Sequence, residues 1–140
     1  MKRLFFYTAI ALVLFCTSCV RRTPESLLRL QFGIDLSNFD YTVESVDDKW
    51  YAPHGEGHCR IVYNFHHVSQ QNIDVVVNAG AKEFPIPDTI PKCGRMRKEV
   101  QDDKHRGYYI FVENKDDTDE FKYFILDITA KKAVLYYQVM

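Results

Sequence analysis

The sequence predicts an α+β fold, in which a sheet of about five antiparallel strands carries a C-terminal three-strand meander and is covered by one or two short helices. Three observations support this class. Several segments alternate apolar and polar residues, as half-buried strands do. The last three of these segments follow one another with short connections, which favours antiparallel pairing, since parallel pairing needs a long crossover. Tyr and Phe are plentiful, with 9 and 10 residues, and they pack well on half-buried sheets.

The first expected element is a helix that begins near Thr23. Thr23-Pro24-Glu25 combines an N-cap residue, a proline at the first helical position and an acid in the first turn. Apolar residues follow between positions 27 and 32, and Gly33 is a suitable residue to end the helix. The pattern predicts a helix of about two turns.

Two strands and a second helix are expected next. Residues 39–46 and 58–65 alternate apolar and polar side chains, which predicts two strands, and residues 50–57 between them form a loop with two glycines. Ser69 is a suitable N-cap for a helix that ends at Asn78.

The C-terminal half begins with a proline-rich segment. Residues 84–94 carry three prolines, so we expect an extended edge or a loop there and not a central strand. The meander then comprises three strands at residues 108–113, 120–128 and 133–139.

The N-terminus has the layout of an export signal. Lys2 and Arg3 precede an uncharged stretch from residue 4 to 15, and Thr17-Ser18 comes directly before Cys19. The stretch is shorter than the roughly 20 residues that span a bilayer. This segment resembles the bacterial lipoprotein signal, which implies a signal peptide at residues 1–18 and a lipid on Cys19. A tether at residues 19–22 and a single α+β domain at residues 23–140 follow from it.

The resemblance also implies a location. Several acyl chains on Cys19 would hold the protein on a membrane durably, whereas a single chain binds reversibly. Val20-Arg21-Arg22 lacks the aspartate associated with inner-membrane retention, which favours the periplasmic face of the outer membrane. An ordinary signal peptide, or an uncleaved N-terminal anchor, stays an open alternative.

The charge and the motifs of the sequence limit the classes of function that we expect. Removal of residues 1–18 leaves 122 residues, enough for one core. These residues carry 16 basic and 19 acidic side chains, which does not favour nucleic-acid binding. The sequence holds no nucleophile elbow, phosphate loop or dinucleotide fingerprint, so we expect no cofactor.

One compact group of metal-capable residues lies between the first two strands. If this stretch is extended, His54, Glu56 and His58 point to the same side, and two imidazoles with one carboxylate are a known catalytic zinc set. In the simpler interpretation, which we favour, the two glycines make a turn and the histidines are solvated. His105, in a charged loop, is also expected to be solvated.

Two cysteines remain after Cys19. In an oxidising compartment Cys59 and Cys93 can form a disulfide, which would close a loop of about 35 residues and stabilise the fold by roughly 3–4 kcal/mol. The competing interpretation has Cys59 buried as a small apolar residue in its strand, with Cys93 as a thiol in a loop.

Short motifs over residues 35–140 resemble a second group of proteins. His54-Gly55-Glu56-Gly57, Phe84-Pro85-Ile86-Pro87, the segment 107–111 and the closing strand are similar to a group of small, uncharacterised bacterial proteins that are often exported. This resemblance implies a shared fold and no activity. From the anchor, the size and the absence of a catalytic constellation we expect a non-enzymatic envelope lipoprotein. It presents a binding domain to a protein partner or another envelope component, and its ligand is unknown. The alternative is a metal-binding protein or a metal-dependent hydrolase using the His54 group.

Overall fold

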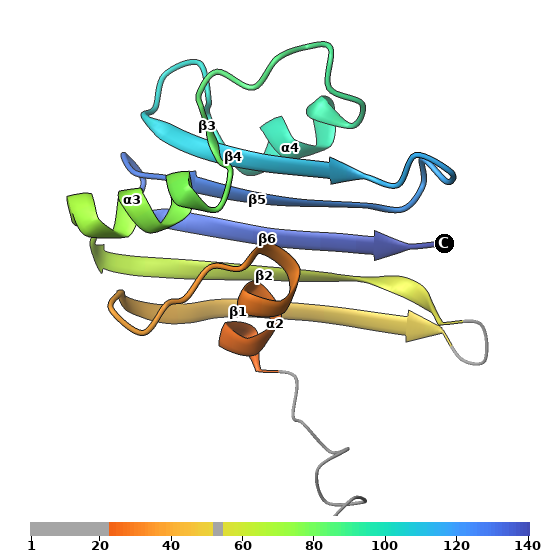
Figure 1. The fold of residues 1–140 in the computed structure, drawn as a ribbon, viewed down its shortest axis with the longest axis horizontal. Helices are drawn as coiled ribbons and strands as arrows, with labels where there is room; N and C mark the ends of the chain where they lie inside the picture. Colours follow the sequence, from red (N-terminus) through yellow and green to blue (C-terminus); the bar gives the residue numbers. More distant parts are fainter. Residues whose placement is uncertain (1–22, 52–54) are drawn as a thin grey trace, which may run out of the picture.

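The computed structural model describes residues 23–51 and 55–140 (Figure 1). Its elements in chain order are α2 (Pro24–Phe32), β1 (Asp40–Tyr51), β2 (Glu56–His67), α3 (Gln70–Asn78), β3 (Lys82–Glu83), α4 (Cys93–Glu99), β4 (Gly107–Glu113), β5 (Phe121–Asp127) and β6 (Lys132–Val139). The predicted signal peptide at residues 1–18, the predicted lipid site Cys19 and the predicted tether at residues 19–22 all lie outside the described residues.

The six strands form one sheet in the order β1-β2-β6-β5-β4-β3, with every pair antiparallel. The prediction of five strands under one or two helices is therefore wrong, since the described residues contain six strands and three helices. The sixth strand, β3, has only two residues, which pair with Tyr109 and Tyr108 of β4. Two residues are too few to show an alternating pattern, so β3 exists only through its pairing.

The helix α4 was not predicted. Its first two residues, Cys93 and Gly94, end the segment that we expected to be an extended edge or a loop, and no element was expected for the other five. It covers seven residues and has no side-chain hydrogen bond at its N-terminus, where Lys92 has a left-handed backbone with φ 69°. The helix therefore lacks the N-terminal capping side chain that marks the start of a helix in a sequence. Its one buried side chain, Met96, attaches it to the sheet.

The hairpin of β1 and β2 is longer than predicted. Both strands have 12 residues, and the pairing continues to Trp50 opposite Gly57 and Tyr51 opposite Glu56. Half of the expected loop at residues 50–57 is thus part of the sheet.

The first two helices begin where the sequence places their caps. Thr23 and Ser26 exchange side-chain and backbone hydrogen bonds at the start of α2, and Ser69 and Asn72 do the same at the start of α3. Gly33, with φ 69°, ends α2 in the left-handed conformation.

The sheet has a front face, covered by α2 and α3, and a back face, covered by α4 (Figure 1). The front core includes Leu28, Cys59, Ile61, Tyr63, Val76, Phe124, Leu135 and Tyr137. The back core includes Val62, Ile86, Met96, Tyr109, Phe121, Tyr123, Ile125, Val134 and Tyr136. Residues that alternate along each strand thus enter two different cores.

Candidate functional site

The predicted metal group is only partly within the described residues. His54 lies outside them, and Glu56 is exposed at the first position of β2. His58 is half-buried on the back face, where its Nε2 lies 3.5 Å from Asp47 Oδ2 and its ring stacks on Tyr136 with the centroids 6.0 Å apart. Within residues 23–51 and 55–140, no three metal-ligating side chains come together. The metal site stays a prediction.

The two cysteines of the domain belong to different faces. Cys59 is buried in the front core, as the second interpretation of this residue expects. Cys93 begins α4 and packs against the back core, with its Sγ 3.8 Å from the carbonyl oxygen of Asp88. The sheet lies between the two side chains, which argues against a disulfide. Cys19 lies outside the described residues.

We expected His105 to be solvated, but its imidazole contacts a buried carboxylate. Its Nδ1 lies 2.7 Å from Oδ2 of the buried Asp127, whose other oxygen accepts a hydrogen bond from the amide of Ala130 at 2.9 Å. The sequence hides this pair because 22 residues separate its members. The contacts join the loop before β4 to the turn after β5.

Charged side chains on the back face hold α4 in place. Arg97 contacts Asp88 and Asp102, and Oδ2 of the buried Asp102 accepts a hydrogen bond from the amide of Ile86 at 2.7 Å. Arg60 of β2 pairs with Glu99 at the end of α4. These basic residues are thus used within the fold.

Aromatic rings fill the back face beside α4. The rings of Phe121, Tyr123 and Tyr136 stack on one another with centroids 5.2–6.4 Å apart. The guanidinium of Arg95 lies over Phe121 and donates a 2.9 Å hydrogen bond to the Tyr136 hydroxyl. The hydroxyl of Tyr123 is buried without a hydrogen-bond partner among the described residues, and this burial raises the pKa of Tyr123.

A groove of about 650 Å³ opens on the front face, between α2 and the end of the sheet where β6 finishes. We call it the α2 groove. It is lined by Leu27, Leu30, Gln31, Trp50, Gly55, Val112, Glu113, Asn114, Glu120, Phe121, Lys122, Tyr137, Gln138 and Val139. Ligand sites in proteins are commonly concave, largely apolar and about 300–1,000 Å³ in volume. The α2 groove matches this description.

The floor of the groove comes from the sheet. Trp50 and Tyr137 lie across β2 from each other, with ring centroids 5.4 Å apart. Gly57 of β2 is opposite Trp50 of β1 and Val139 of β6, while Tyr137 is opposite Cys59, two residues further along β2. Because glycine has no side chain, the two rings meet over β2.

The wall of the groove is α2. Leu27 is buried, whereas Leu30 is 75% exposed although it is a large apolar residue. Lys122 of β5 joins wall and floor: its Nζ donates to the carbonyl oxygen of Gln31 at 2.5 Å and lies 5.2 Å from the ring centroid of Phe32. Partial burial lowers the pKa of Lys122.

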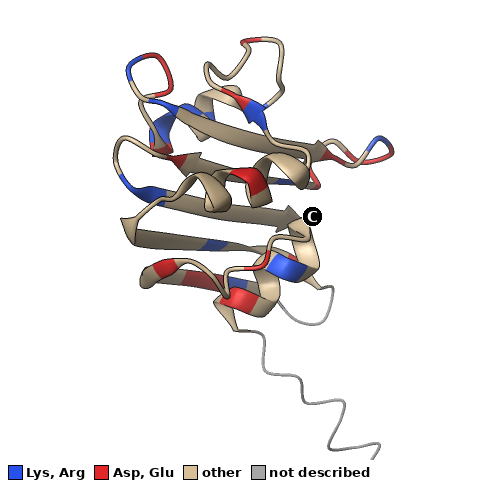
Figure 2. Ribbon diagram, turned by 60° about the vertical axis from the view of Figure 1, so that its left-hand side comes forward, with Lys and Arg blue, Asp and Glu red and all other residues tan. Residues whose placement is uncertain are grey.

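The rim of the groove is acidic. Glu113 and Glu120 flank the turn between β4 and β5, and residues 113–122 contain five acids against two lysines. Oε1 of Glu113 is shielded from solvent and has no hydrogen-bond partner among the described residues. The acids of this turn and of β1 are visible in Figure 2.

Sequence reasoning did not find the α2 groove, although one signal was present. The signal was Leu30, an apolar residue of α2 that lies off the helix face carrying the buried Leu27 and Leu28 and therefore does not pack in the core. The other lining residues come from strands distant in sequence, and only the sheet order brings them together.

Comparisons with known proteins add no family to this picture: no protein-family model, curated protein or solved structure matches the chain. Within the described residues, none of the helices has the length and apolar character needed to cross a membrane. The function is therefore inferred from the groove and from the sequence.

Proposed function

We propose that the chain is a lipoprotein of the bacterial cell envelope whose domain binds a partner protein without catalysing a reaction. The observation that carries this proposal is the α2 groove, whose apolar lining is open to solvent. Six large apolar residues are exposed among the described ones, and two of them, Leu30 and Val112, line the groove. A third, Met140, directly follows the lining residue Val139. Exposed apolar residues that gather in one place are typical of binding sites.

The lipid on Cys19 would keep this groove close to the membrane. Pro24, the first residue of α2, is five positions after Cys19. A fully extended chain spans at most about 3.5 Å per residue, so the start of α2, the helix that forms the wall of the groove, would lie within roughly 18 Å of Cys19. Such a short tether suits a domain that meets partners at the membrane surface.

The groove is tested with Nile red, an uncharged dye that fluoresces in apolar surroundings. We expect the domain to bind the dye and Leu30→Lys to weaken this binding by at least about tenfold, because the loss of one buried leucine contact corresponds to about 1.5–3 kcal/mol. Val77→Lys is the matched control, since Val77 is 41% exposed on α3. Equal binding by wild type and both variants would contradict the proposal that the groove is the binding site.

The anchor is tested separately by Cys19→Ala in the full-length chain. We expect the variant to leave the membrane fraction and to take up no labelled fatty acid, because it lacks the thiol that carries the lipid. Ser18→Thr retains a small residue before Cys19 and serves as the control. A wild-type protein that takes up no label, with a variant that stays on the membrane, would contradict the lipoprotein assignment.

A further inference from the structure

We infer that the occupant of the α2 groove is a cationic amphipathic helix of a partner protein. This inference rests on the proposed binding function and adds the chemistry of the partner. Shape, apolar surface and charge each contribute one step.

The shape of the open area fits one helix. The floor strands β4, β5 and β6 have 7, 7 and 8 residues and extend about 23–27 Å. On the front face α3 runs roughly along the strands and α2 crosses them (Figure 1). The groove of about 650 Å³ opens beside α2, toward the end of the sheet where β6 finishes. Since a helix is about 10–12 Å wide, the groove can accommodate one face of a short helix.

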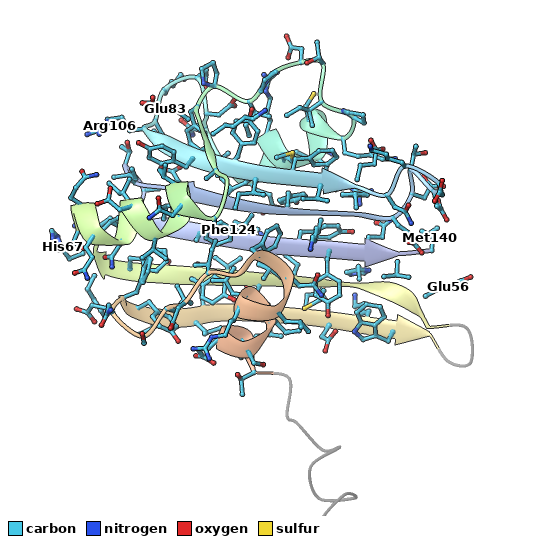
Figure 3. The ribbon with its side chains drawn as sticks, viewed as in Figure 1. Glu56, His67, Glu83, Arg106, Phe124 and Met140 are labelled. Carbon is cyan, nitrogen blue, oxygen red and sulfur yellow. The ribbon has the colours of Figure 1, made fainter. Side chains whose placement is uncertain are left out.

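The apolar surface in this area has the arrangement that a helix contacts. Leu30 projects from α2 on one side, while Val112 and Val139 belong to the floor. Met140 and Glu56 lie at the same end of the sheet (Figure 3). A helix with apolar residues at i, i+3, i+4 and i+7 would contact both wall and floor, which is the usual mode of helix-in-groove recognition.

The negative charge of the rim favours a partner helix that is positively charged. Among the described residues, Lys122 is the only basic one that lines the groove, and its ammonium group is already bound by Gln31 and the ring of Phe32. Glu113 and Glu120 thus place two carboxylates on the rim against this one occupied ammonium group, and Glu113 Oε1 has no partner among the described residues. Complementary charges across an interface favour association, so the partner helix carries Lys or Arg on its polar side.

The same charges disfavour two other occupants. Anionic lipid surfaces attract basic segments and repel an acidic rim. A second copy of this chain would bring two acidic rims together around the groove. Both occupants are outcomes of the experiment below.

Trp50 supplies the readout, because it is the only tryptophan of the sequence and it lines the groove. Three synthetic 14-residue amphipathic helices without tryptophan, which share one leucine face and carry Lys, Gln or Glu on the other, are titrated while Trp50 emission is recorded. We expect the Lys peptide to bind at least about tenfold more tightly than the Glu peptide at low salt. This preference should decrease as salt screens the rim.

Variants locate the binding. Leu30→Lys should abolish the response to the Lys peptide, and Val77→Lys should leave it unchanged. Glu113→Gln combined with Glu120→Gln should reduce the preference for the Lys peptide over the Glu peptide. Glu83→Gln is the matched control for this change, since Glu83 is exposed at the opposite end of the sheet (Figure 3).

The outcomes separate the inference from the proposed function. If all three peptides bind equally, the cationic assignment is wrong while the groove remains a binding site. If anionic phosphatidylglycerol vesicles shift Trp50 emission and Leu30→Lys removes this shift, the occupant is a membrane. If sedimentation shows a dimer that Leu30→Lys dissociates, the occupant is a second copy. If neither Nile red nor any peptide binds, the proposed function fails as well.

Discussion

Replacing Gly57 by alanine introduces a methyl group where the structure has no room for one. A Cβ at Gly57 would lie 2.1 Å from the carbonyl oxygen of Lys49 and 2.8 Å from both Cα and Cε3 of Trp50. The first two atoms belong to the backbone of β1, which the pairing with β2 holds in place. Gly55 is the matched control, because its φ is 70° but no heavy atom lies within 4 Å of its added Cβ.

Two effects set the expected loss of unfolding free energy in Gly57→Ala. Forcing an extra methyl group into a packed region costs about 1–3 kcal/mol of unfolding free energy. Holding a residue other than glycine at φ 156° costs roughly 1–3 kcal/mol more. Gly57→Ala should therefore destabilise the domain by about 2–6 kcal/mol. Gly55→Ala, which bears only the left-handed backbone, should cost about 1–2 kcal/mol.

Urea unfolding followed by far-ultraviolet circular dichroism measures both free energies. Because small domains are typically stable by about 5–15 kcal/mol, a loss of the expected size lowers the unfolding midpoint clearly. Trp50 emission in the native state reports independently whether the indole moves. If Gly57→Ala costs no more than Gly55→Ala, the close approach of β1 to Gly57 is incorrect.

Two further predictions concern tyrosine hydroxyls. Tyr63 and Tyr123 are both fully buried, but the Tyr63 hydroxyl donates to the carbonyl oxygen of Pro24 at 2.8 Å while that of Tyr123 has no partner among the described residues. In urea unfolding, Tyr63→Phe should lower the free energy of unfolding by about 1 kcal/mol, whereas Tyr123→Phe should leave it unchanged or raise it. Equal losses in the two variants would count against this contrast. Tyr41 donates to Glu25 at 2.5 Å and lowers its pKa, so Tyr41→Phe should raise the Glu25 pKa in a carbon-13 NMR titration. A carboxyl group whose pKa is lowered in the native state adds stability above its unfolded pKa, and this stability is lost as the pH falls through the native pKa. Tyr41→Phe should therefore show less acid destabilisation than the wild type around and below pH 4.5. An unchanged Glu25 titration would refute the hydrogen bond between Tyr41 and Glu25.

The sequence predicts those elements whose signals are local. Thr23 and Ser69 mark the starts of two helices because a cap requires only a few neighbouring residues. The strands β4, β5 and β6 were expected at residues 108–113, 120–128 and 133–139, and they lie at 107–113, 121–127 and 132–139. Their alternation is regular, and the turns between them leave few other pairings.

Elements that depend on distant contacts were not predicted. Lys82 and Glu83 become a strand only because β4 offers an edge, and α4 lacks a capping side chain and depends on the burial of Met96. The α2 groove was even harder to predict from the sequence. Its lining residues come from α2, β1, β4, β5 and β6, so it exists only once the order of the strands is known.

Trp50 and Gly57 show how the hairpin and the groove depend on each other. Because a Cβ on Gly57 would meet Cε3 of Trp50 at 2.8 Å, the indole lies directly over the glycine and takes the place of its missing side chain. An aromatic ring that covers a cross-strand glycine is a known device for stabilising a sheet. Here it also brings the indole to Tyr137 on the far side of β2, which makes the groove floor continuous. A methyl group at Gly57 would displace this ring, so Gly57→Ala should weaken binding of the Lys peptide even under conditions in which the variant is folded.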